Sequence, residues 1–154
     1  NSTSVANNRP LVVKASIPSH RKGATSIPEI AEAFLESGIE TPSYVLDQRA
    51  FHHNGSILKH VQDETGAKIL LAQKAFSCTA IYPILRNYLA GTTASGLFEA
   101  RLAAEEFGGD VHVFSPAYKP AEMDELVKIA DHIVFNSVAQ WKRYREQVLC
   151  ADRH

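Results

Sequence analysis

Several things are scarce in this sequence, and each scarcity excludes a class of protein. The 154 residues include only two cysteines, too few for a disulfide scaffold, and no Cys/His cluster has zinc-site spacing. No apolar run approaches the roughly 18 residues that a membrane span needs. The 16 basic and 17 acidic residues nearly balance, which does not favour a nucleic-acid partner. The sequence therefore predicts a protein of a reducing, cytoplasmic compartment with no metal, membrane or nucleic-acid partner.

Acidic residues are missing altogether from the first 28 positions. This segment holds Arg9, Lys14, Arg21 and Lys22 among many Ser, Asn and Thr residues, and all 17 acidic residues follow it. We interpret residues 1–27 as a basic, flexible leader and 28–154 as the domain proper. The alternative is an organelle transit segment, which is also poor in acids. The first residue is Asn rather than Met, which indicates a processed protein or a fragment.

From residue 26 onward, strand patterns alternate with helix patterns. Short apolar runs start near residues 43, 68, 91, 111 and 132, at intervals of roughly 20–25 residues that each hold one helix-like segment. Capping boxes at 26–29 and 137–140 mark two helix starts. Parallel strands need such crossovers, so the fold class is α/β. Two architectures fit this spacing: a complete open sheet, or about five units of a (β/α)8 TIM-type barrel, which typically needs about 250 residues.

Lys74 is the strongest local anomaly in the sequence. It directly follows the apolar run 69–73, at the carboxyl end of a predicted buried strand, where the active sites of α/β proteins lie. We expect an amine in this place to be poorly solvated, which lowers its pKa and lets it attack an aldehyde. The alternative is a lysine that extends to the surface from a strand end. His112 and His132 fall at strand positions and are expected to be core histidines.

Four segments together resemble a known enzyme family. They are TPSYVLD, AKILLAQKAFS, YLAGTTASGLFEARLAAEEFGGDVHVFSPAY and ADHIVFNS, and they occur in one order over about residues 41–141. They look like carboxynorspermidine (carboxyspermidine) decarboxylase, a pyridoxal-phosphate enzyme with an alanine-racemase-like fold. The resemblance implies an N-terminal (β/α)8 barrel of fold type III followed by a C-terminal β domain. It thus favours the barrel over the open sheet.

The resemblance also implies roles for particular residues. Lys74 would hold the aldehyde of pyridoxal 5′-phosphate, and the substrate would be a carboxylated polyamine that loses carbon dioxide. Ser95 and Asn136 each follow a strand and are weaker candidates for contacts with the cofactor; their alternative role is helix capping or turn hydrogen bonding. The complete enzyme is expected to be a homodimer.

Parts of the family's pattern are not in this sequence. The later barrel strands, the glycine-rich phosphate-binding turn, the acid that faces the pyridine nitrogen and the C-terminal domain have no counterpart in the 154 residues. We therefore expect an N-terminal fragment that does not decarboxylate alone. Two alternatives remain: another fold-III decarboxylase or racemase, of the diaminopimelate, ornithine or arginine type, and a non-catalytic relative that binds the cofactor or a protein partner.

Overall fold

A computed structural model describes residues 26–151 and divides the chain into two compact units, 1–50 and 51–154. The predicted leader lies almost wholly outside the described residues. In the first unit, helix α1 (Ile27–Glu36) begins with the predicted capping box: the Glu29 N–H donates to Ser26 Oγ, and the Ser26 N–H donates to Glu29 Oε2 at 2.9 Å. This part of the prediction is confirmed.

The predicted strand at residues 43–47 is wrong. These residues are not part of the sheet, and Tyr44, Val45 and Leu46 are exposed. Alternating apolar residues favour extended backbone, but a strand also needs a neighbour with which to exchange hydrogen bonds. The structure gives this segment no such neighbour among the described residues.

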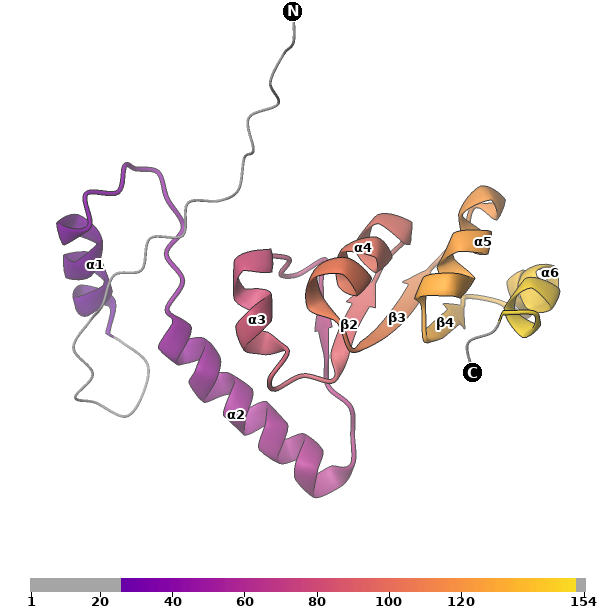
Figure 1. Cartoon of the computed structure of the whole chain (residues 1–154), viewed down its shortest axis with the longest axis horizontal. Helices are drawn as coiled ribbons and strands as arrows, with labels where there is room; N and C mark the ends of the chain where they lie inside the picture. Colours follow the sequence, from indigo (N-terminus) through magenta and orange to yellow (C-terminus); the bar gives the residue numbers. More distant parts are fainter. Residues whose placement is uncertain (1–25, 152–154) are drawn as a thin grey trace, which may run out of the picture. The chain divides into compact units, whose positions relative to one another are not determined.

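The second unit is built on one parallel sheet (Figure 1). Its strands are β1 (Leu70–Ala72), β2 (Gly91–Ala94), β3 (Asp110–Ser115) and β4 (His132–Phe135), and each pairs with the next one along the chain. The α/β class and the parallel pairing are confirmed, with four paired strands in place of five. The sheet formed by the described residues is open, so the predicted barrel is not closed.

Helices alternate with these strands as the sequence predicts, with local differences. They are α2 (Gln48–Thr65), a 3-10 turn (Thr79–Ile81) leading into α3 (Tyr82–Leu85), α4 (Leu97–Leu102), a π-helical segment (Ala103–Phe107), α5 (Pro120–Ile129) and α6 (Val138–Leu149). Helix α3 is short and ends at Leu85. Pro83 lies in its first turn, where proline is tolerated.

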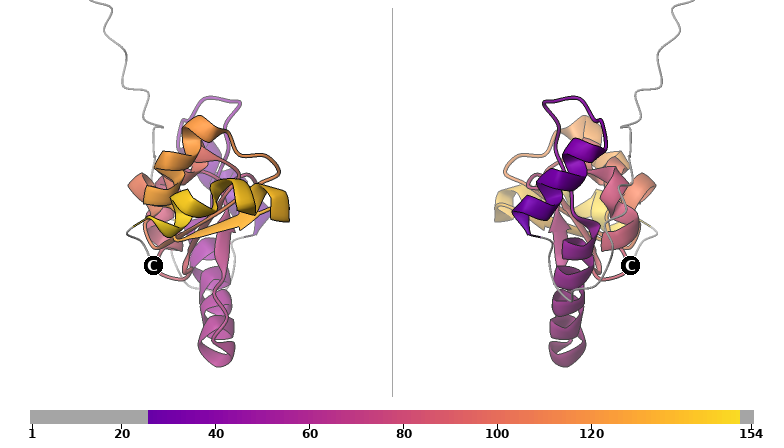
Figure 2. Two further views of the ribbon diagram at one scale, coloured as in Figure 1. Left: turned by 90° about the vertical axis from the view of Figure 1, so that its right-hand side faces the viewer. Right: turned by 90° about the vertical axis from the view of Figure 1, so that its left-hand side faces the viewer.

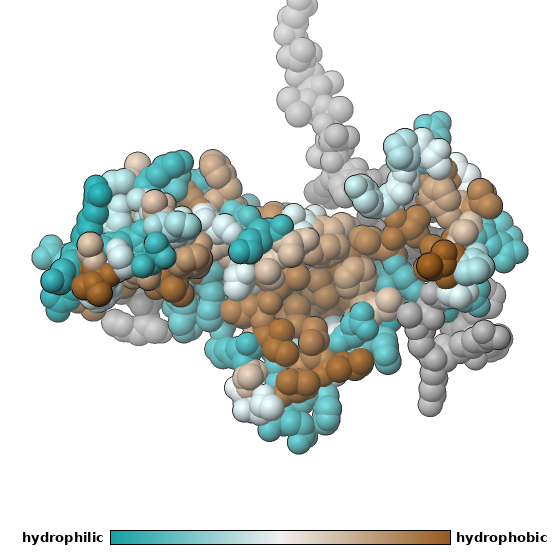
Figure 3. Space-filling view, turned by 180° about the vertical axis from the view of Figure 1, so that it is seen from behind, coloured by the Kyte–Doolittle hydropathy of each residue, from teal (hydrophilic) through white to brown (hydrophobic). Residues whose placement is uncertain are grey.

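The two faces of the sheet differ in how well they are covered. On the covered face, Ala94, Val111 and Val113 are buried in one cluster with side chains of α4, α5 and α6. Figure 2 shows α4 and α5 on the same side of the strands. On the open face, Phe114 and Val134 remain 45% and 50% exposed. Figure 3 shows apolar atoms on the surface of the molecule that faces away from the viewer in Figure 1.

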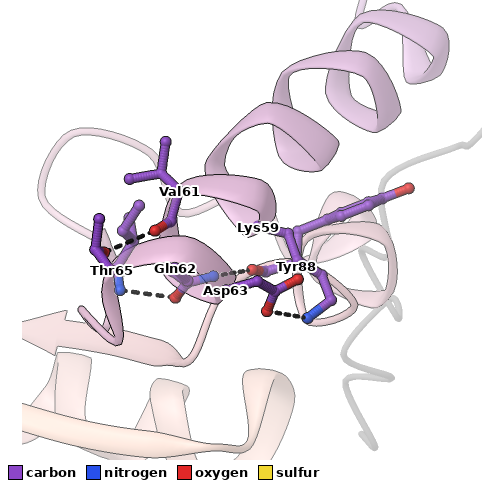
Figure 4. A network of polar contacts seen from close by, with 7 residues as sticks. Lys59, Val61, Gln62, Asp63, Thr65 and Tyr88 are labelled. Atoms are coloured by element: carbon purple, nitrogen blue, oxygen red, sulfur yellow. Dashed lines mark hydrogen bonds and ion pairs between the residues drawn. The ribbon is translucent and has the colours of Figure 1, made fainter.

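A glutamine of α2 fixes the start of β1 (Figure 4). The Gln62 side chain donates from Nε2 to the Tyr88 carbonyl at 2.6 Å, and its Oε1 accepts the Ile69 N–H at 2.8 Å. In the last turn of α2, Thr65 Oγ1 donates to the Val61 carbonyl and accepts the Ala67 N–H. These bonds hold the turn that leads from α2 into β1.

Candidate active site

The three residues singled out in the sequence follow strands of the same sheet. Lys74 comes two residues after β1, and Ser95 and Asn136 come directly after β2 and β4. Because all four strands are parallel, their carboxyl ends meet at one edge of the sheet. The strand order places Ser95 on the neighbour of β1 and Asn136 three strands away. The structure thus brings the three residues to one edge, with Ser95 on the strand nearer to Lys74.

Lys74 is exposed, which differs from the poorly solvated amine expected from the sequence. It lies in a turn where the N–H groups of Ala75 and Phe76 donate to the Ala72 carbonyl at 2.9 and 3.1 Å. The buried side chain at this turn belongs to its neighbour Gln73 instead. The Gln73 N–H still donates to the Thr93 carbonyl of β2, so Gln73 continues the sheet with its side chain buried, whereas Lys74 lies in the turn and is exposed.

Gln73 makes contacts that the sequence analysis missed. Its Nε2 donates to the Glu99 carbonyl at 2.8 Å, and its Oε1 accepts from the Tyr82 hydroxyl at 3.2 Å. Burial raises the pKa of Tyr82, so the phenol stays protonated and remains a donor. The signal was present in the sequence: an amide inside an apolar run must find partners if it is buried.

Ser95 and Asn136 occupy equivalent places before two helices. Each donates its backbone N–H to a side chain three residues into the next helix, Ser95 to Glu99 Oε2 at 2.7 Å and Asn136 to Gln140 Oε1 at 2.8 Å. At α6 the Gln140 N–H also donates to Ser137 Oγ. The predicted capping box therefore forms with one change, because Gln140 accepts from Asn136 rather than from Ser137. Both backbones serve helix capping, while their side-chain roles stay predictions.

Two histidines lie side by side on the neighbouring strands β3 and β4. The rings of His112 and His132 stack with their centroids 4.1 Å apart, and Asp110 Oδ2 lies 3.9 Å from His112 Nε2 and accepts from Lys68 Nζ at 2.5 Å. His112 is half-buried and His132 exposed, so they are not the core histidines expected. Burial, together with the nearby His132, lowers the pKa of His112.

Other classes of site find little support in the part of the chain that the structure describes. Residues 26–151 contain no group of three or more His, Cys, Asp or Glu residues placed to hold a metal ion. Within the same residues, no helix has the length and hydropathy to cross a bilayer. The edge of the sheet that carries Lys74 therefore remains the candidate site.

Comparison with known proteins gives relatives of one kind. No family model matches the chain. It is 43% identical over 112 residues to a carboxyaminopropylagmatine decarboxylase of Synechocystis. The matched residues make up 73% of this chain and 29% of the relative. It is 39% identical to carboxynorspermidine/carboxyspermidine decarboxylases of Herminiimonas arsenicoxydans and Campylobacter jejuni, over 69% and 71% of this chain.

A solved structure gives the same result. The crystal structure of the Campylobacter jejuni carboxynorspermidine decarboxylase complexed with norspermidine superposes with a TM-score of 0.71 and 39% identity, over 72% of this chain and 30% of that one. The chain thus spans slightly less than a third of the length of the relatives that it matches. Over most of its own length, this chain is similar to the carboxynorspermidine and carboxyspermidine decarboxylases, as its sequence motifs predict.

Proposed function

We propose that this chain supplies the lysine-bearing part of a pyridoxal-phosphate-dependent decarboxylase of carboxylated polyamines, with Lys74 as the residue that binds the cofactor covalently. The observation that carries the proposal is the placement of an exposed amine at the carboxyl edge of a parallel sheet, in a chain similar to decarboxylases over about seven tenths of its residues. A solvent-accessible amine fits an incoming aldehyde. The cofactor, when bound, supplies the electron sink that decarboxylation requires.

The strand order supports the finer expectation of a barrel. Strands that pair in the order in which they occur along the chain are typical of a (β/α)8 barrel, whereas a doubly wound sheet reverses its order at a switch point. We propose that β1–β4 form the first half of such a barrel, with the open face directed toward its interior. In this arrangement Lys74 lies at the end of the barrel where active sites occur. As a separate part of the proposal, the complete enzyme is a homodimer.

The role of Lys74 in this proposal is to present its Nζ atom to the cofactor. The turn 72–76 carries this amine, Ser95 offers a polar group on the neighbouring strand end, and Asn136 offers one farther along the same edge of the sheet. The chemical work assigned to this chain is therefore binding and orientation. The groups that would bind the polyamine are not assigned to any residue.

The experiment that tests the proposal is trapping of the cofactor on a particular lysine. The purified chain is incubated with pyridoxal 5′-phosphate, reduced with borohydride and mapped by peptide mass. We expect the main adduct on Lys74, no adduct there in Lys74→Arg, and an unchanged extent of labelling at Lys74 in Lys128→Arg, which alters an exposed lysine on α5. Labelling spread evenly over all lysines would overturn the assignment.

A second assay addresses the reaction itself. We expect no release of carbon dioxide from carboxynorspermidine, carboxyspermidine or carboxyaminopropylagmatine by the 154-residue chain, because it spans under a third of the length of its decarboxylase relatives. Turnover of any of the three substrates would contradict this expectation and show that the remaining length is dispensable. Capture of the cofactor without turnover would match a chain that carries the reactive lysine but lacks the rest of the site.

A further inference from the structure

Gln73 is an unusual residue to find beneath the helices. Its side chain is 2% exposed, and with Thr92 it is one of two buried polar residues among those that the structure describes. A buried amide loses its bonds to water, so it stabilises a fold only when both ends of the amide find partners. An apolar residue of the same size would fill the space without that requirement. The position beside Lys74 suggests what the amide adds.

The amide joins three elements at the carboxyl edge of the sheet. The Gln73 N–H continues the sheet by donating to the Thr93 carbonyl at 3.3 Å. Its side chain bonds to the backbone of Glu99 in α4 and to Tyr82 in α3. Glu99 in turn accepts the Ser95 N–H with its carboxylate. The Gln73 side chain therefore ties the end of β1 to both helices, and Glu99 extends this network to the loop that follows β2.

The other side of Lys74 is fixed as well. Phe76 packs in a cluster with Ile81, Tyr82 and Leu85, and its ring centroid lies 5.5 Å from that of Phe51. Its N–H donates back to the Ala72 carbonyl. Lys74 thus has an exposed side chain on a backbone held on both sides. A reacting group gains most from positioning when its backbone cannot swing away from the site.

We propose that Gln73 is a positioning residue: its buried amide, bonded to Tyr82 and Glu99, sets the direction in which the Lys74 backbone presents its amine to an aldehyde. This inference rests on the proposed function of Lys74. It assigns to Gln73 no contact with cofactor or substrate. The amide acts only through the turn that carries the lysine.

The other end of β1 provides a matched control. Gln62 also bridges two backbone groups with its amide, at the start of the strand and away from Lys74 (Figure 4). Gln73→Met and Gln62→Met each remove two hydrogen bonds while keeping an unbranched side chain of similar length. Tyr82→Phe is a third variant, which removes only the donor to Gln73 and keeps the packed ring.

The measurement is the rate of labelling of Lys74 by pyridoxal 5′-phosphate and borohydride, divided by the rate at Lys128 in the same molecules, over a range of pH. We expect Gln73→Met to lower this ratio about tenfold and Tyr82→Phe to lower it less, with a changed pH profile at Lys74. Gln62→Met should leave both the ratio and the pH profile unchanged. The internal reference at Lys128 separates positioning from a general loss of stability.

Three results would be decisive against the inference. An unchanged ratio in Gln73→Met and Tyr82→Phe would leave Gln73 with a structural role only. An equal fall in Gln62→Met would mean that any weakening of β1 acts on Lys74. Should Gln73→Met not fold, Tyr82→Phe alone decides between these outcomes. A wild-type chain whose Lys74 labels no faster than Lys128 would overturn the proposed function of Lys74 itself. This outcome is seen in the wild type alone, so it is distinguishable from the two outcomes that concern the variants.

Discussion

The two faces of the sheet carry different kinds of side chain, although the same four strands supply both. On the covered face, Val111 and Val113 of β3 pack against Met123 and Leu126 of α5 in one buried cluster. On the open face, the alternate residues of β3 and β4 include the stacked pair His112 and His132 together with Phe114 and Val134. Alternation alone produces this contrast, because successive side chains of a strand point to opposite faces.

The comparison shows that burial and chemistry are separated within single strands. The covered face holds mainly apolar groups, with two buried polar side chains, Thr92 in β2 and the bonded amide of Gln73 near the end of β1. The open face mixes apolar with titratable groups, as expected of a face directed toward a site or toward further parts of a protein. If this interpretation is right, substitutions on the two faces should differ in cost even at adjacent positions.

The largest expected difference is between Val113 and Phe114. Val113 is fully buried, so Val113→Asp would place an unpaired carboxylate in the core and destabilise the fold by about 4 kcal/mol or more. Phe114→Asp should cost less than about 1 kcal/mol. Urea denaturation followed by circular dichroism measures both. Equal losses would show that the open face is covered in solution, and the contrast between the faces would fail.

Gly91 tests whether close approach of two strand backbones limits substitution independently of the two faces. A Cβ atom at Gly91 would overlap the backbone oxygen of Asp110 on the adjacent strand. Gly91→Ala should therefore force β2 and β3 apart and cost about 3 kcal/mol. Gly96→Ala is the matched control, since nothing lies within 4 Å of a Cβ there, and it should stay within about 0.5 kcal/mol. A neutral Gly91→Ala would contradict the close strand approach.

The sequence predicted the parts of this fold that depend on local pattern. Four apolar runs become the four strands, because each run lies beside another that can accept its hydrogen bonds. The run at 43–47 has the same local pattern, and only the absence of a described neighbour separates it from the others. Periodicity contains no information on pairing. The sequence therefore cannot distinguish an extended segment from a strand.

The candidate site shows a similar limit. The place of Lys74 at a strand end follows from the sequence pattern, but its exposure does not. The pattern does not locate the exact residue at which the strand gives way to the turn, and a shift of one residue would exchange the environments of Gln73 and Lys74. The bonds of Gln73 join residues 9 and 26 positions away, to Tyr82 and Glu99. Contacts at such separations depend on the tertiary fold, so reading along the chain did not reveal them.

A smaller effect is expected where two tyrosines differ in burial. On the covered face the Tyr118 hydroxyl accepts the Ser115 N–H and donates to the Val134 carbonyl at 2.8 Å. Tyr118→Phe should cost about 1–2 kcal/mol, because buried backbone groups lose a partner. Among residues 26–151, the hydrogen bond of the Tyr88 hydroxyl is to the exposed ring of His52, so Tyr88→Phe should cost less than about 0.5 kcal/mol. Unfolding in urea compares the two variants, and the reverse order would contradict their assigned environments.

The smallest effect concerns the open face and pH. Burial lowers the pKa of His112 below its ordinary 6.5, so the unfolded chain takes up a proton at a higher pH than the folded one. The stability associated with this ring is present above about pH 6.5 and is lost as pH falls below it. The pKa of Asp110 is also lowered, by its bond to Lys68, but the corresponding loss of stability comes only below about pH 4.

Unfolding free energies at pH 7.5 and 5.5 should therefore differ less in His112→Asn than in the wild type. The exposed His53, changed to Gln, is the control that should keep the wild-type difference. An unaltered difference in His112→Asn would mean that this ring is hydrated like the rest of the open face.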